Sequence, residues 1–245
     1  PLPPRIDVDF EMGRYVKAFG GQLGLDLFGH SPDFANADYV FARDNVIAEL
    51  KCLTDDKSED EDLQKKLEEL FESAIRKGHM QDPGPGQVLM ETKGTPLAFQ
   101  RQVYQVISKS LKRRLAKANK QIKQTKARLN RPDALGLVLL CNDGNFRLEP
   151  AQWVHAVRVA LGNDFSSINS VVQFTVNMLS TTPMMGQHAN LWMSGQRPGI
   201  KPVSEDFLHR LGEGWARHVG QLHNMPVTWN PVSYTHLTLP TNREV

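Results

Sequence analysis

The chain has 245 residues, with 29 lysines and arginines against 27 aspartates and glutamates, a formal net charge of +2 and a hydrophobic fraction of 40%. No apolar run approaches the roughly 18 residues of a membrane-spanning helix, and no basic-then-apolar signal segment opens the chain, so we expect a cytoplasmic protein with no membrane partner. The two cysteines and eight histidines show no zinc-ligand spacing, and we predict buried thiols and no zinc site.

An amphipathic helix is the first predicted element, between Asp7 and the glycine pair at residues 20–21. Its apolar side chains recur at helical spacing: Val8, Met12, Tyr15, Val16 and Phe19. We expect this helix to pack on a sheet formed by the next element and by later strands.

Residues 37–53 predict a β-hairpin, because two runs rich in β-branched and aromatic residues flank a polar turn. If Ala42 pairs with Asn45 across a two-residue turn, the numbers of paired residues sum to 87. Asp38 then lies directly opposite Glu49, with Cβ atoms about 4.5–5.5 Å apart. A change of one residue in the turn would move the two side chains to opposite faces.

Lys51 shares the face of Glu49, because side chains alternate along a strand. Two carboxylates so close repel each other, and one keeps its proton unless a cation compensates the charge. Mg²⁺ or Mn²⁺ suits oxygen ligands and keeps several waters, while a nearby ammonium can orient a water or balance phosphate charge. Asp38, Glu49 and Lys51 therefore predict metal-assisted phosphodiester hydrolysis. An ion pair between Glu49 and Lys51 on an exposed sheet face is the alternative.

Asp38, Glu49 and Lys51, in this strand context, resemble the PD-(D/E)xK or restriction-endonuclease-like nuclease superfamily over roughly residues 7–180. The resemblance implies an α/β fold with a mixed central sheet flanked by helices, and a nuclease in which Asp38 and Glu49 hold Mg²⁺ or Mn²⁺. It also makes Glu11, on the first helix, a candidate third metal ligand; a solvated helix charge is the alternative. Asp38 lacks the proline that precedes it in the family's pattern.

The acid-x-Lys triplet occurs three times in the sequence, so two other triplets compete with residues 49–51. Residues 55–57 lie in a solvated acidic run. Glu91-Thr92-Lys93 follows an apolar run, but proline and glycine separate it from its upstream acid, Asp82, and interrupt strand pairing. Pro32-Asp33 is the literal Pro-Asp pair, yet its odd offset from Asp38 places it on the other strand face.

Two helices of opposite charge are predicted next. Residues 59–77 begin with acids and carry apolar side chains at helical spacing, so we expect an acidic helical insertion within residues 55–98. A long helix over residues 97–130 follows. Its predicted buried side consists of Val103, Ile107, Leu111, Ala118, Ile122 and Leu129.

The other side of the long helix is predicted to be basic, with Arg114 among its residues, and no acid occurs between Glu91 and Asp133. Local charge of this kind attracts phosphate backbones, so we predict a nucleic-acid partner, with DNA favoured over RNA; a solvated face is the alternative. The predicted contacts are Lys112, Arg113, Lys117, Lys120 and Lys123. The family resemblance adds Gln121 and Lys123, because relatives often place a polar residue near the metal on this helix.

A continuous apolar run at residues 134–141, a helix at 150–161 and a strand at 168–177 complete the predicted α/β core. We expect this core to occupy residues 1–180. Residues 181–231 predict a long loop and then a C-terminal helix at 205–222.

Residues 232–245 resemble translated vector or adapter sequence, and we expect them to lie outside the fold.

Overall fold

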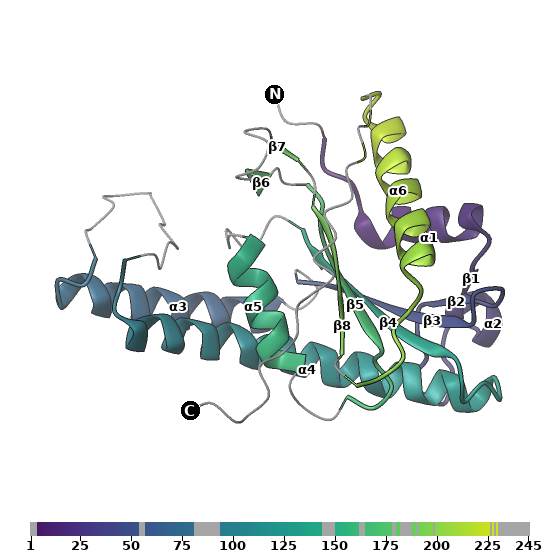
Figure 1. Ribbon diagram of the computed structural model, residues 1–245, viewed down its shortest axis with the longest axis horizontal. Helices are drawn as coiled ribbons and strands as arrows, with labels where there is room; N and C mark the ends of the chain where they lie inside the picture. The colour runs from purple at the N-terminus through teal and green to yellow at the C-terminus, as the bar shows by residue number, and fades with distance from the viewer. Residues whose placement is uncertain are drawn as a thin grey trace.

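A six-stranded mixed β-sheet with helices against both faces forms the structure (Figure 1). This computed structural model describes residues 4–53, 57–80, 94–143, 150–161, 165–177, 180–181, 188–189, 191–197, 199–225, 227 and 229. The strand order is β1 (Gln22–Leu23), β2 (Tyr39–Phe41), β3 (Val46–Cys52), β4 (Leu135–Asn142), β5 (Ser170–Thr175) and β8 (Trp192–Gln196). β3, β4 and β5 run parallel, whereas β2 and β8 run antiparallel to their neighbours. The predicted α/β class with a mixed sheet is confirmed.

Two helical layers cover the two faces of this sheet. α3 (Lys57–Arg76), α4 (Leu97–Arg128) and α5 (Pro150–Leu161) share one hydrophobic core with the first face. α1 (Val8–Phe19) and α6 (Glu205–Leu222) share a second core with the other face. α4 and α5 are crossovers between parallel strands that step in the same direction across the sheet. Because such connections are right-handed, both helices fall on the same face.

Two short elements lie outside these layers. α2 (Gly24–Phe28) follows β1, and β6 (Ser180–Thr181) pairs with β7 (His188–Ala189) in a separate two-stranded sheet. Among the helices that the structure describes, none combines the length and apolarity needed to cross a membrane.

Local sequence accounts for the main elements. α1 begins where the side chain of Asp7 accepts a hydrogen bond of 3.1 Å from the N–H of Phe10, and it ends at Gly20, whose φ of 96° is left-handed. β3 and β4 are buried along nearly their whole length, as expected for central strands covered by helices on both sides. Cys52 and Cys141 are paired on these strands as buried free thiols, which confirms their prediction.

The predicted helices match the structure closely. α5 and α6 have the predicted bounds, and α1, α3 and α4 agree within two residues. The predicted buried side of α4 is also confirmed, although Leu129 at its end is only partly buried.

The loop predicted after residue 180 needs correction, because it contains β8, which pairs with β5 along five residues. Its sequence, with Ser194 and Gly195, has weak strand propensity, and the hydrogen-bonding edge of β5 supplies what local propensity lacks. β8 and α6 therefore belong to the same sheet and core as the preceding residues. Several predicted features fall outside the described residues. These are the rival triplet at 91–93 with its upstream acid Asp82, most of the triplet at 55–57, and residues 232–245.

Candidate functional site

The hairpin of β2 and β3 has the predicted register. Tyr39 pairs with Ala48 and Phe41 with Val46, so paired numbers sum to 87. Asn45, at the end of the turn, has a φ of 54°, a left-handed conformation that asparagine adopts more readily than most residues. Extending this register by one step places Asp38 opposite Glu49, as the sequence predicted.

Asp38 and Glu49 are held by reciprocal hydrogen bonds between backbone and side chain. The N–H of Asp38 donates to Oε2 of Glu49 at 3.1 Å, and the N–H of Leu50 donates to Oδ2 of Asp38 at 2.8 Å. β2 begins at Tyr39, so the ladder between β2 and β3 has ended at Asp38. The carboxylate of Asp38 accepts from the N–H of Leu50 on β3 at this place. The carboxylate of Glu49 is therefore held by the backbone of Asp38, and the carboxylate of Asp38 by the backbone of Leu50, the residue after Glu49.

Lys51 completes the cluster, because its Nζ forms an ion pair with Oε1 of Glu49. The side chain of Glu49 is 1% exposed and that of Lys51 is 13% exposed. The ammonium therefore lies at the outer side of the cluster, with the Glu49 carboxylate beneath it. The ion pair of the alternative reading is therefore present, but its exposed position is wrong, because α4 covers this face of the sheet.

Burial, and after it the negative charge of Asp38, raise the pKa of Glu49 from its ordinary value of 4.5 to about 8, although Lys51 acts to lower it. The positive charge of Lys51 therefore compensates only part of the cost of two adjacent acids in a buried place. A cation added between the acids would act in the opposite direction and would favour the ionised form of Glu49.

The cluster faces α4. Val40 and Ile47 contribute to the core on the α4 side, and Asp38, Glu49 and Lys51 lie an even number of residues from them. Side chains of α4 hold the segment that leads into Asp38. Gln121 Nε2 donates to the carbonyl of Asn36 at 3.0 Å, and Thr125 Oγ1 accepts from the N–H of Ala37 at 2.8 Å.

Gln121 is brought toward Asp38 as the resemblance implied, since it contacts a residue two positions away. Its Oε1 is a buried acceptor with no hydrogen-bond partner among the described residues. An unpaired buried carbonyl is unfavourable, and a water or ligand donor at this place would satisfy it. Lys123, by contrast, is exposed on the outer side of the helix and does not join the cluster.

Arg114 is a residue that the sequence reasoning misassigned to the basic surface. It is 7% exposed, and its Nη2 donates to the carbonyl of Leu53 at 3.2 Å, directly after β3. The helical spacing in the sequence indicates that Arg114 is buried, because it lies three residues after Leu111 and four before Ala118, on the buried side of the helix. Arg114 thus anchors the end of the strand that carries Glu49 and Lys51.

Glu11 is not brought to the pair. It lies on α1, which covers the other face of the sheet, and it accepts hydrogen bonds from Arg14 at 3.1 Å and contacts His218 Nε2 at 2.9 Å. It is 9% exposed, so the alternative of a solvated charge is also corrected. Glu11 instead joins α1 to α6.

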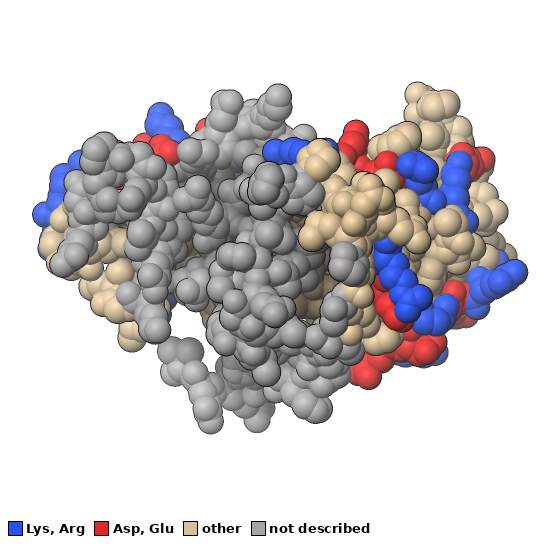
Figure 2. Space-filling model, turned by 90° about the horizontal axis from the view of Figure 1, so that it is seen from above, with Lys and Arg blue, Asp and Glu red and all other residues tan. Residues whose placement is uncertain are grey.

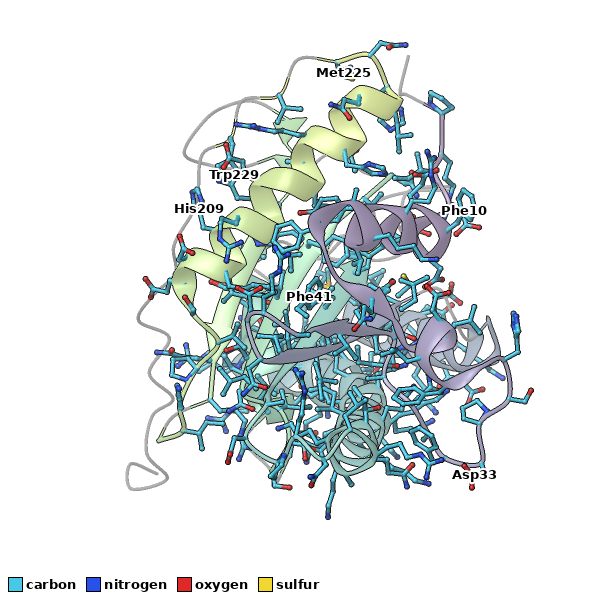
Figure 3. The ribbon with its side chains drawn as sticks, turned by 90° about the vertical axis from the view of Figure 1, so that its right-hand side faces the viewer. Phe10, Asp33, Phe41, His209, Met225 and Trp229 are labelled. Carbon is cyan, nitrogen blue, oxygen red and sulfur yellow. The ribbon has the colours of Figure 1, made fainter. Side chains whose placement is uncertain are left out.

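The literal Pro-Asp pair does not reach the cluster either. Asp33 is exposed in the loop before β2, and Figure 3 shows it far from Phe41 of that strand. The parity argument against Asp33 therefore agrees with its position, although the strand does not extend that far.

Within the described residues, no group of three or more histidine, cysteine, aspartate or glutamate side chains is arranged to hold a metal ion. Asp38 and Glu49 supply carboxylate oxygens only. Mg²⁺ commonly uses one or two carboxylates and completes its shell with waters and substrate phosphate, so this donor set fits Mg²⁺ or Mn²⁺ better than zinc.

Comparison with known proteins found no family model, no curated protein and no solved structure that matches this chain.

Proposed function

We propose that the chain is a divalent-metal-dependent nuclease that hydrolyses phosphodiester bonds of nucleic acid at Asp38, Glu49 and Lys51. The observation that carries this proposal is the convergence of two carboxylates and one ammonium on the same sheet face, in a place that raises the pKa of Glu49. The order of elements, with α1 before an antiparallel hairpin and α4 as the crossover to parallel β4, supports the restriction-endonuclease-like fold that the resemblance implies.

The protein groups have distinct roles in this proposal. Asp38 and Glu49 hold the cation through their carboxylate oxygens. When bound, Mg²⁺ or Mn²⁺ supplies positive charge at the scissile phosphate and a more acidic water. Lys51 Nζ, at the more exposed side of the cluster, donates hydrogen bonds to the attacking water or to a phosphate oxygen. Gln121 Oε1, buried and unpaired, accepts a hydrogen bond from the same water and so restricts its orientation.

A second candidate function is a non-catalytic nucleic-acid-binding or assembly protein that keeps this cluster for structural reasons. Both oxygens of Glu49 and one of Asp38 already accept hydrogen bonds from protein donors. The cluster can therefore close the open end of the hairpin without any ion. This candidate predicts nucleic-acid binding that is indifferent to metal.

A cleavage assay separates the two functions. The purified protein is incubated with mixed DNA and RNA substrates in Mg²⁺, in Mn²⁺ and in EDTA, beside the variants Asp38→Asn, Glu49→Gln and Asp33→Asn. Metal-dependent cleavage that is lost in the first two variants and kept in Asp33→Asn, an exposed acid outside the cluster, supports the nuclease. Binding without cleavage under every condition supports the second candidate.

A further inference from the structure

The outward surface of α4 is basic over most of its length. We define the α4 basic face as the exposed lysines and arginines between residues 101 and 123: Arg101, Lys109, Lys112, Arg113, Lys117, Lys120 and Lys123. The helix contains no acidic residue. Within the described part of the chain, Lys109, Lys112, Lys117, Lys120 and Lys123 form no ion pair.

The opposite layer of the molecule shows a different charge pattern. On α6, Arg210 pairs with Asp206 and Asp44, and Arg217 pairs with Glu213. Figure 2 views the molecule from the α6 side, and its described part shows blue side chains beside red ones. Positive charge is therefore neutralised locally on that side, whereas the five α4 lysines named above form no ion pair within the described residues, and their charge attracts a polyanion.

The length of the α4 basic face is close to one helical turn of duplex DNA. Arg101 and Lys123 are separated by about 33 Å at 1.5 Å per residue, and one turn of B-DNA measures about 34–36 Å. A straight helix of this length can contact phosphates on both sides of a groove. Contacts of this kind position a protein on DNA without reading its sequence.

Aromatic side chains are missing from this face. The two aromatic residues of α4 are Phe99, which is 6% exposed, and Tyr104, whose ring lies 4.8 Å from that of His155 on α5. Proteins that bind single strands combine positive charge with aromatic platforms on which bases stack. The α4 basic face offers the charge alone, which favours a duplex whose bases remain paired.

We propose that the α4 basic face binds the phosphate backbone of duplex DNA without sequence preference. The inference deepens the proposed function and rests on it for the fate of the bound strand, whereas binding itself needs no metal. Lys117 links the α4 basic face to the candidate site. It lies three residues after Arg114 and four before Gln121, on the edge of the helix nearest that site. The strand that contacts Lys117 is the one presented to Lys51.

Fluorescence anisotropy in EDTA tests the proposal with a labelled 30-base-pair duplex, an unrelated duplex and the matching single strand. The test variant carries Lys112→Gln, Lys117→Gln and Lys120→Gln. The control variant carries Lys17→Gln, Lys65→Gln and Lys201→Gln, which remove the same charge from exposed lysines outside α4. Circular dichroism confirms that both variants are folded.

We expect the parent protein to bind both duplexes with similar affinity and more tightly than the single strand. The slope of log K against log salt should fall in magnitude by about 2.7 in the test variant, at about 0.9 for each lost phosphate contact, and should change much less in the control. Tighter binding to the single strand, an unchanged slope in the test variant or no binding would overturn the proposal. Duplex binding without cleavage in Mg²⁺ would instead count against the nuclease alone.

Discussion

Replacement of Glu49 by glutamine should change how the stability of the protein depends on pH. The pKa of Glu49 is raised from 4.5 to about 8 because the carboxyl group is buried beside Asp38. Between these two values the folded protein keeps a proton that the unfolded chain has released. The folded state is therefore favoured most below pH 4.5, and this contribution is lost as the pH rises through 8.

The structure gives the size of this effect. Each pH unit inside the window changes the free energy of unfolding by about 1.4 kcal/mol, so the raised pKa gives a loss of roughly 3–4 kcal/mol between pH 5 and pH 8. Glutamine keeps the shape of the protonated acid and has no proton to lose. The stability of Glu49→Gln relative to the parent should thus rise by about this amount across the range.

Urea unfolding in EDTA at pH 5, 6, 7 and 8 measures the difference, because all other titrating groups are shared by the two proteins. Equal m-values would show that both unfold from the same compact state. A stability difference that stays constant from pH 5 to pH 8 would refute the reasoning, since it would mean that Glu49 is ionised in the folded protein without a bound cation.

Three further predictions concern the cluster and the segment that leads into it. Affinity for Mn²⁺, measured by calorimetry, should rise about tenfold per pH unit between pH 5.5 and 7.5, because binding must displace the proton of Glu49. Lys51→Ala should remove most cleavage at saturating metal while Mn²⁺ binding persists; cleavage at the parent's rate would reduce Lys51 to a structural partner. Gly24→Ala should cost about 1–3 kcal/mol in thermal or urea unfolding, because a Cβ there would lie 2.1 Å from the carbonyl oxygen of Ala37. Gly195→Ala, whose nearest contact would be at 4.0 Å, is its control and should unfold almost like the parent.

The hairpin could be predicted from the sequence because its determinants are local. A polar turn between two β-rich runs fixes the pairing, and alternation then fixes which side chains share a face. Asp38, Glu49 and Lys51 followed from these two rules, without knowledge of any other element. The helices were predicted for the same reason, since caps and apolar spacing lie within each segment.

Local rules of this kind could not predict how elements distant in sequence pack against one another. Apolar spacing showed which side of α1 is buried, but it carries no information on which face of the sheet the helix covers, and the position of Glu11 depends on that choice. β8 escaped prediction because its strand conformation depends on hydrogen bonds to β5, a partner distant in sequence. Arg114 was misplaced because residue type was given more weight than helical phase.

α4 holds both ends of the hairpin. Arg114 donates a hydrogen bond to the carbonyl of Leu53 at one end, and Gln121 donates to the carbonyl of Asn36 at the other, beside the contact of Thr125 with Ala37. Arg114 and Gln121 are seven positions apart, which is about two turns of helix. A single inserted or deleted residue between them would rotate one of these side chains by about 100° around the helix relative to the other, and one of the two hydrogen bonds to the hairpin would be lost. The number of residues between Arg114 and Gln121 is constrained by these two hydrogen bonds, whatever the identity of the residues between them. Insertions and deletions between residues 114 and 121 should therefore be rejected.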